Sequence, residues 1–575
     1  MHEEPSAARA YGPSRATRAI RLPAPVQGAT RMNETTSKDH GDRARGRLRG
    51  LYVGLVVLSV LVALPLTGYL LLPSALEPFH AQYVEHCADC HGEDMLGTGI
   101  GPSLLGRELA GGDTVDALRV AIAEGAPGRG MPAWGSQLSA DEISAIAILI
   151  GERRRDFDFI GLLEPGAVDL TTSSFTTEAH DLHVQTVFDG LQAAVFSVAP
   201  MPDGSILVTE KAGGLWRISP DGTTRTRIEG VPALLGSAMG FGQLAVGTGW
   251  LLEVALHPRY EENGWIYLSH TDRIEGVLPT SMVRLIRGRI VEDQWVDTDV
   301  IWAADERFYT ATPDTAAAGR IAFDDTGHVY LSVGLKSLVP NGGVQDLDQP
   351  YGKIHRVRDD GAIPPDNPFL DTPDALPTTW TYGHRSPQGL EFDPVTGTLW
   401  GTEMGPRGGD EINVLQRGDN YGWPLVSRGL EYDGKEIDYG PMFGIEFDPD
   451  DLEPPLVDLT PAPAVSSFVV YDGEAFPAWR GDLIVGSLRA RALYRFAFDG
   501  RRLVHRELLL RGLARIRDIE VEQQGTILLL LESRAGSQIV RLVPGARAPE
   551  APAANTALLP ADLPGPGLAQ RAPRP

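Results

Sequence analysis

A repeated pair of short strands constrains the fold of this chain more than any other feature. A turn glycine followed by an apolar stretch occurs six times, at intervals of 44 to 84 residues. The six copies are DGSILVTE from Asp203, NGWIYLSH from Asn263, TGHVYLSV from Thr326, TGTLWGTE from Thr396, RGDLIVGS from Arg480 and QGTILLLL from Gln524. The short stretches that follow them are LWRI, MVRL, IHRV, INVL, LYRF and IVRL. Six hairpin-like pairs predict a mainly β fold, a six-bladed β-propeller over residues 181–545, since a β-sandwich rarely repeats pairs at this spacing.

The segments outside this array differ from it in composition. Residues 76–155 show helical periodicity, best seen in LSADEISAIAILI, where Ser139 and Glu142 are placed to form a capping box. They are predicted to form a small all-α domain, joined to the propeller by a linker at 156–180. The basic segment 1–50 and the Pro/Ala-rich tail 546–575 lack periodicity, and their composition predicts disorder.

An apolar run at 51–72 contains no charge over 22 positions, enough to cross a bilayer core of about 30 Å. The arginine-rich stretch RARGRLRG precedes it, whereas the first charge after it is Glu77. By the positive-inside rule, the N-terminus stays in the cytoplasm and the rest of the chain is exported. The run therefore predicts a single-pass anchor in a bacterial inner membrane, with the folded domains in the periplasm. A cleaved secretory signal is the alternative, but its apolar core is usually shorter and ends at an A-x-A site.

The chain is strongly acidic. Its formal charge is −25, and because residues 1–50 carry +5, the remaining residues carry −30. Such a charge argues against nucleic acid as a partner. The only cysteines are Cys87 and Cys90, so no disulfide framework stabilises the fold.

The sequence CADCH, from Cys87 to His91, is the most specific local motif. In a C-x-x-C-H motif the two thiols add to the haem vinyl groups and the histidine ligates iron. A zinc site would need a second Cys/His cluster, and a redox dithiol needs no histidine. The motif therefore predicts haem c bound covalently to Cys87 and Cys90, with His91 as an axial ligand.

The second axial ligand is predicted to be Met131, in the RGMPAW loop 40 residues after His91. This loop precedes the capped helix, so the thioether can approach the opposite side of the haem, whereas Met95 is too close to His91 in sequence. The region resembles the small class I cytochromes c. His/Met ligation in that family implies electron transfer rather than oxygen binding.

Two stretches rich in Gly, Pro and charge lie between predicted strands: TYGHRSPQGLEF from Thr381 and GTEMGPRGGDEINVLQRGDNYGWP from Gly401. With RGDLIVGSLRARALYRF and ARIRDIE, they resemble the soluble PQQ-dependent glucose and aldose sugar dehydrogenases, the glucose/sorbosone dehydrogenase family. The resemblance covers most of residues 185–545. It implies an oxidoreductase that uses pyrroloquinoline quinone (PQQ) and calcium.

The resemblance implies that basic residues hold the three carboxylates of PQQ, because planar guanidinium groups bind carboxylates well. The matching positions are Arg385, Arg489, Arg515 and Arg517. Arg489 stands where the family often has lysine, and Ser386 stands where it usually has asparagine.

Calcium is implied at two places. One ion, which polarises the quinone as a Lewis acid, would be held by the backbone carbonyls of Gly405 and Pro406. A further structural calcium site would use Glu411 and Tyr421.

The stretch DTAAAGRIAF from Asp314 departs from the family at its catalytic residue. The family pattern is His-x-x-Gly-Arg, in which the histidine is the general base, and aligning Gly319 and Arg320 places Ala316 at the histidine. The accompanying departures are Thr315 and Leu335, where the family has aspartate, and Thr248, where it has glutamine. Loss of a general base typically costs about 10²–10⁴-fold in rate. Asp314 is the candidate substitute, and His355 and His384 are weaker ones.

Two classes of function follow. The first is a membrane-anchored quinohaemoprotein that oxidises a sugar or related alcohol at PQQ and calcium. It would pass electrons through the haem to a respiratory-chain acceptor, with an altered or relocated base. The second is a catalytically inactive propeller that serves as a binding or electron-relay protein. The retained arginines and calcium loop favour the first.

Overall fold

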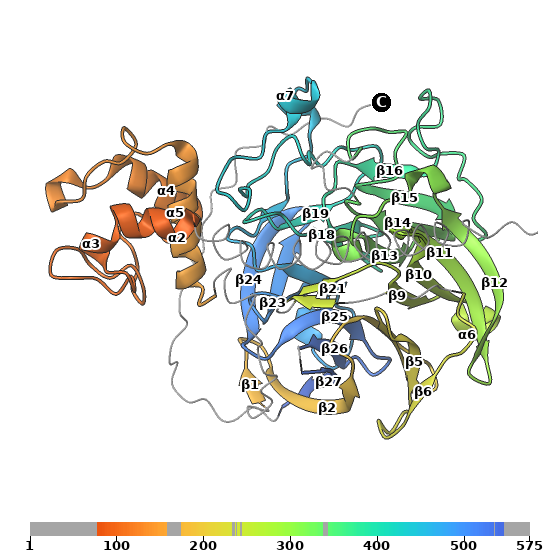
Figure 1. Cartoon of the computed structure of the whole chain (residues 1–575). Coiled ribbons are helices and arrows are strands. Elements are labelled where there is room, and N and C mark those ends of the chain that lie inside the picture. The colour runs from red at the N-terminus through yellow and green to blue at the C-terminus, as the bar shows by residue number, and fades with distance from the viewer. Residues whose placement is uncertain are drawn as a thin grey trace, which may run out of the picture. The chain divides into compact units, whose positions relative to one another are not determined.

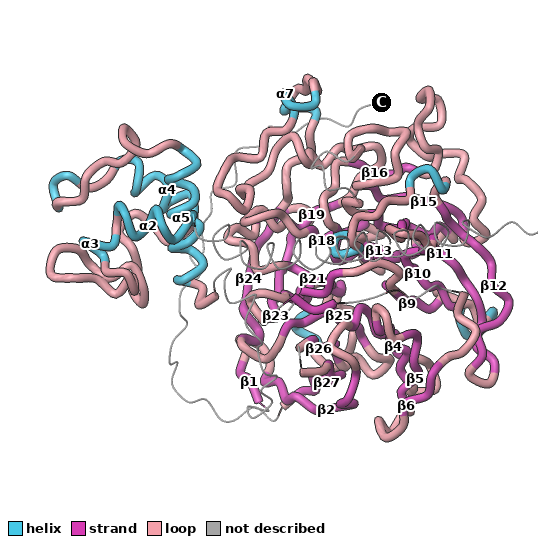
Figure 2. Tube along the Cα trace, viewed as in Figure 1, coloured by secondary structure: helices cyan, strands magenta, loops and turns pink. Residues whose placement is uncertain are grey.

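A computed structural model of the chain describes residues 78–157, 174–232, 236, 239–241, 244–336, 343–533 and 535–545. Helices dominate before residue 158 and strands after residue 173 (Figure 2). The predicted anchor at 51–72, the basic segment 1–50 and the tail 546–575 lie outside the described residues. Within the described ranges, no helix is long and apolar enough to span a membrane.

The N-terminal part is an all-α domain. Its elements are α2 (Pro78–His86), α3 (Ala88–His91), α4 (Val115–Glu124), the 3-10 turn η1 (Pro127–Arg129) and α5 (Ala140–Arg154). The predicted capping box starts α5: the Ser139 hydroxyl accepts from the backbone N–H of Glu142, whose carboxylate accepts from Ser139 N at 2.7 Å. Phe79, Leu118 and Ile146 belong to one buried apolar cluster, which packs α2, α4 and α5 together.

The C-terminal part is the predicted six-bladed propeller (Figure 1). Four consecutive strands form each of five blades. These are β3 (Val195–Pro200), β4 (Ile206–Glu210), β5 (Gly214–Ile218) and β6 (Arg225–Arg227); β9 (Leu251–Leu256), β10 (Ile266–Ile274), β11 (Thr280–Val291) and β12 (Gln294–Ala303); β13 (Ala318–Phe323), β14 (His328–Val333), β15 (Lys353–Arg358) and β16 (Thr379–Tyr382); β17 (Pro387–Phe392), β18 (Leu399–Glu403), β19 (Glu411–Val414) and β20 (Val457–Asp458); and β21 (Val465–Val470), β22 (Leu483–Ser487), β23 (Ala492–Asp499) and β24 (Arg502–Arg511). The repeated sequence pairs are the second and third strands of the blades.

The sixth blade joins the two ends of the propeller segment. It contains β25 (Arg515–Val521), β26 (Ile527–Glu532) and β27 (Ser537–Pro544), completed by β2 (Asp181–Leu191) and β1 (Ser174–Thr176). Strand β2 pairs with β27 along its length, from Leu182 opposite Pro544 to Leu191 opposite Ser537. The first strands of neighbouring blades are in contact in the order β3, β9, β13, β17, β21, β25 and back to β3, which closes the ring.

Shorter elements occupy the connections. They are β7 (Met239–Phe241), β8 (Leu244–Val246), α6 (Tyr260–Asn263), η3 (Glu306–Phe308), η4 (Asp314–Ala316), α7 (Gly440–Phe443), η5 (Pro449–Asp451) and η6 (Pro477–Trp479).

Antiparallel pairing brings functional loops to one face of the propeller. In each blade the start of the first strand lies opposite the end of the second strand. The registers Val195–Glu210, Ala318–Val333, Pro387–Glu403, Val465–Ser487 and Arg515–Glu532 show this in five blades. Because the first strands of all blades run in the same direction along the central axis, these loops share one face. We call it the entry face.

Truncation of Leu182 tests the closure of the ring. This side chain is fully buried in the cluster around β26 and β27, so Leu182→Ala should cost about 2–5 kcal/mol of unfolding free energy. Urea denaturation of the propeller would measure the loss. The exposed Val504 on β24 provides the control, since Val504→Ala should leave stability nearly unchanged. Equal effects of the two variants would contradict this role of β2.

Candidate functional site

The CADCH motif spans α3 and the residue before it. Cys87 and Cys90 are free and half-buried, as haem attachment requires. Nδ1 of His91 lies 2.8 Å from the Pro102 carbonyl. A carbonyl only accepts, so Nδ1 carries the proton and Nε2 keeps its lone pair for a metal. The residues present therefore fit a covalently bound haem with His91 as a ligand.

The two methionines considered as second ligand lie in different surroundings. Met95 is buried in the core of the helical domain, so its side chain serves packing. Met131 is half-buried in the loop between η1 and α5, where its backbone pairs with Ala126 in both directions. Its position keeps it available as the second axial ligand, which remains a prediction.

The entry face collects the site residues predicted in the propeller. Arg515 starts β25, Arg385 lies just before β17 and Arg489 lies just after β22. Ala316 ends η4 before β13, and Leu335 follows β14. These two are neighbours of the arginine site: Leu335 N donates to the Arg385 carbonyl at 2.8 Å, and a Cβ on Gly334 would lie 2.0 Å from the Ala316 carbonyl.

Arg515 and Arg517 share one carboxylate. Nε of Arg515 and Nη2 of Arg517 lie 3.3 and 2.6 Å from the same oxygen of Glu532. Burial would raise the pKa of Glu532, but the charges of Arg517 and Arg515 outweigh it and lower the pKa to about 2. Nη1 of Arg515 and Nε of Arg517 are buried without a hydrogen-bond partner in the described part of the chain. Unused cationic donors of this kind fit a ligand with carboxylate groups.

Arg385 and Arg489 lie in a second group, around Asp410. Arg385 donates to the carbonyls of Met404 at 3.1 Å and Gly405 at 2.8 Å, and the carboxylate of Glu403 accepts from its backbone N–H. Arg489 donates to the Ala462 carbonyl and pairs with Glu152 at the end of α5 at 3.4 Å. Burial raises the pKa of Asp410 to about 7, although the positive charges of Arg489 and Arg385 oppose this rise.

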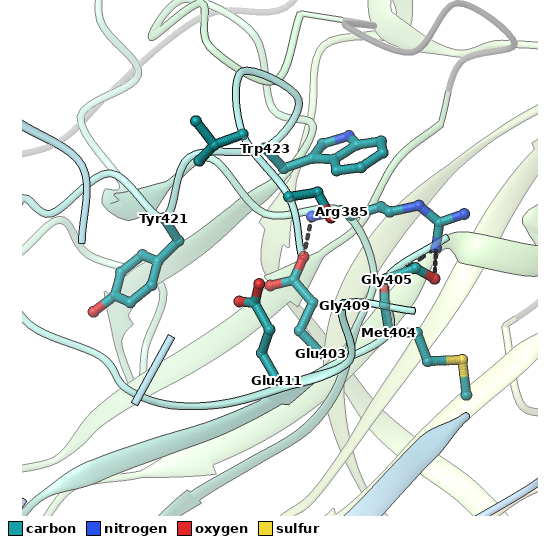
Figure 3. A pocket seen from close by; sticks show the side chains of 10 residues that line it. Arg385, Glu403, Met404, Gly405, Gly409, Glu411, Tyr421 and Trp423 are labelled. Carbon is teal, nitrogen blue, oxygen red and sulfur yellow. Dashed lines mark hydrogen bonds between the residues drawn. The ribbon is translucent and has the colours of Figure 1, made fainter. Parts of the chain in front are cut away.

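Glu403 and Glu411 line a small pocket beside Arg385, with Tyr421 and Trp423 on its other walls (Figure 3). Burial raises the pKa of Glu411 well above its usual range, and the charge of Glu403 raises it further. The hydrogen bond to Glu411 comes from the Asn413 amide at 3.1 Å, which is a weak compensation.

Glu411 is a half-buried carboxylate with little compensating charge, whereas Glu403 already accepts from the backbone N–H groups of Arg385 and Ser386 and contacts Nδ1 of His384. An undercompensated carboxylate such as that of Glu411 fits a hard cation such as calcium. Glu411 is thus well placed for the expected structural site. The phenol of Tyr421 already donates to the Val414 carbonyl at 2.7 Å, so only its backbone remains to serve as a ligand. At the expected catalytic calcium site, the Gly405 carbonyl accepts from Arg385 and keeps one lone pair, and Pro406 is buried beside it.

Asp314, the candidate substitute base, is 2% exposed and fully hydrogen-bonded. One carboxylate oxygen accepts from Gly249 N at 2.8 Å and from the Thr271 hydroxyl at 2.5 Å. The other accepts from the Ser281 hydroxyl at 2.7 Å and forms an ion pair with Lys336. With both oxygens occupied, Asp314 holds the loop in place, and this geometry argues against it as a base.

The two histidine candidates are also engaged in structure. His355 is fully buried between Thr378 and the Pro350 carbonyl, and burial lowers its pKa to about 3. His384 is buried with Nδ1 at 2.9 Å from Glu403 and its ring stacked on Tyr421. Neither offers a free nitrogen to a substrate.

Sequence reasoning missed Glu532, Glu403, Asp410 and Lys336, all of which orient predicted residues. Glu403 and Glu532 each end a repeat strand opposite the start of the first strand of the same blade. Asp410 accepts from the backbone N–H of Val465, and Lys336 pairs with Asp314, so these two contacts join residues more distant in sequence. An acidic residue at the end of a second strand recurs as Glu210, Glu403 and Glu532, and this pattern could have revealed Glu403 and Glu532 but not Asp410 or Lys336.

Removing the charge of Asp314 tests its structural role. Asp314→Asn leaves the buried Lys336 without a counter-charge, so it should lower unfolding free energy by about 3–5 kcal/mol. Denaturant titration measures this. The exposed pair Asp433–Lys435 provides a matched control, where Asp433→Asn should cost at most about 1 kcal/mol. A stable Asp314→Asn variant that loses only substrate oxidation would instead identify a catalytic base.

Replacing Met131 tests the iron ligand. In the protein with covalently attached haem, Met131→Ala should abolish the thioether-to-iron charge-transfer band and lower the reduction potential, because a sulfur ligand stabilises ferrous iron. Met95→Leu is the control and should retain the band, since Met95 packs in the core. An unchanged spectrum in Met131→Ala would refute the assignment.

Comparison with known proteins places both parts of the chain. Residues 192–541 match the model of the Glucose / Sorbosone dehydrogenase family, and residues 74–150 match that of Cytochrome C oxidase, cbb3-type, subunit III. The aldose sugar dehydrogenase YliI of Escherichia coli is 31% identical over 344 residues, 59% of this chain and 88% of that protein. Quinoprotein glucose dehydrogenase B of Acinetobacter calcoaceticus is 26% identical over 407 residues, 58% of this chain and 82% of that protein.

A solved structure agrees with these matches. The soluble aldose sugar dehydrogenase of Escherichia coli, in its apo form, superposes with a TM-score of 0.55 at 28% identity, covering 63% of this chain and all of that one. The family match spans more than half of the chain and coincides with the six blades described above. The chain therefore belongs to the glucose/sorbosone dehydrogenase family and carries a cytochrome c domain before its propeller.

Proposed function

We propose that the protein is a periplasmic, membrane-anchored quinohaemoprotein that oxidises a sugar or related alcohol with PQQ and calcium. Electrons would leave through haem c to a respiratory-chain acceptor. The observation that carries this proposal is the pair of buried arginines, Arg515 and Arg517, whose unused donors lie on the entry face. The names of two relatives, a quinoprotein glucose dehydrogenase and an aldose sugar dehydrogenase, support the same chemistry.

The residues of the chain divide the work of the site. Arg515 and Arg517 would bind carboxylates of the cofactor, and Glu532 keeps their guanidinium planes oriented between turnovers. Glu403 fixes the backbone of Arg385. Together with Glu411 it would hold the structural calcium in the pocket beside the loop of Gly405. PQQ, when bound, supplies the two-electron acceptor.

The cytochrome c domain completes the electron path in this proposal. Fusion keeps the acceptor at a high effective concentration next to the propeller. Cys87 and Cys90 would attach the haem, and the hydrogen bond from His91 to Pro102 would orient the imidazole toward iron.

The candidate general bases of the site are not free to accept the substrate proton. Ala316 carries no base, and Asp314, His355 and His384 are all committed to structural hydrogen bonds. Ordinary aldoses should therefore react slowly even when the cofactor is bound. This observation also supports the second candidate, a propeller that relays electrons or binds a ligand without oxidising sugar.

Haem reduction decides between these functions. The membrane fraction of a host that matures haem c, supplied with PQQ and Ca²⁺, would be mixed with a panel of aldoses and alcohols while the ferrous haem band is recorded. We expect slow or absent reduction with aldoses and faster reduction with another alcohol. Reduction should disappear on calcium chelation and in Arg515→Ala, because the cofactor is then lost.

A gain-of-function test restores the residues that the family has at these positions. The triple variant Ala316→His, Leu335→Asp and Thr248→Gln should raise aldose turnover toward about 1–10³ per second, since a positioned base returns about 10²–10⁴-fold. Wild-type glucose oxidation already in that range would contradict the lost base. No reduction by any substrate, in wild type or triple variant, would favour the relay.

A further inference from the structure

Lys211 is a buried lysine on the entry face that neither the sequence motifs nor the proposed mechanism uses. It follows the last residue of β4 and is only 5% exposed. Its ammonium nitrogen lies 4.7 Å from the ring centroid of Trp250 and 5.9 Å from that of Phe196. Over the described ranges, no carboxylate or carbonyl lies within hydrogen-bond or ion-pair distance of this nitrogen.

The groups facing Lys211 are mostly cationic. They are Arg517 and Arg515 on β25, Glu532 on β26 and Arg320 on β13. Arg320 is neutralised separately, by Asp518 at 2.7 Å and Glu253 at 3.5 Å. The preceding residue, Glu210, is committed to Arg225 at 2.6 Å.

Glu532 is therefore the one carboxylate left for three buried cations. Lys211, Arg515 and Arg517 are each at least nine-tenths buried, and together with Glu532 they leave an excess of two positive charges. Aromatic faces attract a cation, but they do not neutralise it. Buried charges are normally paired, so this excess points to an anionic ligand with at least two charges.

The protonation of Lys211 reflects this excess. Burial, and after it the positive charge of Arg517, lowers the pKa of Lys211 to about 7, with Glu532 opposing the shift only in part. A carboxylate placed next to the nitrogen would favour the charged form again and raise the pKa.

We propose that Lys211 is a further cofactor-binding residue, whose ammonium joins Arg515 and Arg517 in binding the carboxylates of PQQ. The inference rests on the proposed function, because it takes the anionic ligand to be PQQ. It adds a proton-coupled contact to a set of permanently charged arginines.

The sign of the expected pH dependence follows from the two states of Lys211. Below pH 7 the free protein already holds the proton, so PQQ binds with full affinity. Above pH 7 the proton must be taken up on binding, so the dissociation constant should rise by up to about tenfold per pH unit until the raised pKa of the bound state is reached. Arginines do not titrate in this range.

Calorimetric titration of PQQ into the haem-containing protein with saturating Ca²⁺ tests the proposal. Runs at pH 8 in buffers of different ionisation enthalpy should show uptake of close to one proton per PQQ in wild type. Lys211→Met should weaken binding at least about tenfold at pH 6.5 and abolish the uptake. Lys211→Arg should bind tightly and also lose the uptake, because it keeps the charge without titrating. The exposed Lys435→Met is the control and should match wild type.

The outcomes separate this inference from the proposed function. PQQ binding without proton uptake in wild type, or wild-type affinity in Lys211→Met, would overturn the role of Lys211 and leave the quinoprotein proposal standing. Failure of wild type to bind PQQ would overturn both. Melting curves and the haem spectrum report whether each variant is folded, and if Lys211→Met is not, the proton uptake of wild type decides alone.

Discussion

Pairing of β2 with β27 is the interaction on which the rest of the propeller depends. The residues of the candidate site come from several blades: Lys211 from the first, Ala316 from the third, Arg385 from the fourth and Arg515 from the sixth. None of these blades could hold the geometry alone, because each touches only its neighbours. The strand pairs that join the two ends of the propeller segment fix the ring, and the ring fixes the distances across the entry face.

The sequence predicts the middle strands of the blades better than their edges. Turn glycines such as Gly204 and Gly327 adopt positive φ before a second strand, so they mark each repeat. First strands such as β21 are buried on both sides and have no alternation to distinguish them. The closure by β1 and β2 leaves no local pattern, since Leu182 and Pro544 are paired across the whole propeller.

In the candidate site, too, local motifs are predictable from the sequence and tertiary contacts are not. CADCH is a contiguous motif, so the sequence alone predicts the haem site, and the arginines are predicted because they match family motifs. The ion pair of Asp314 with Lys336, and the sharing of Glu532 by Arg515 and Arg517, depend on tertiary packing. Sequence reasoning consequently offered Asp314 as a free acid, whereas burial and four donors have made it part of the scaffold.

The same packing explains how a base can be lost while the cofactor residues persist. Ala316 is a half-exposed residue at the end of η4. Because Asp314 holds this loop in place, the side chain at position 316 is not needed for the loop structure. Arg515 and Arg517 are different, because each is paired with Glu532, which in turn needs them to offset its burial. Losing either arginine would leave a buried carboxylate undercompensated, at a cost to folding as well as to binding. Folding thus explains in part why the arginines are retained, and the support for a bound cofactor comes from their unused donors, Nη1 of Arg515 and Nε of Arg517. The excess charge contributed by Lys211 argues more strongly for a bound anion, since stability alone gives no reason to keep it.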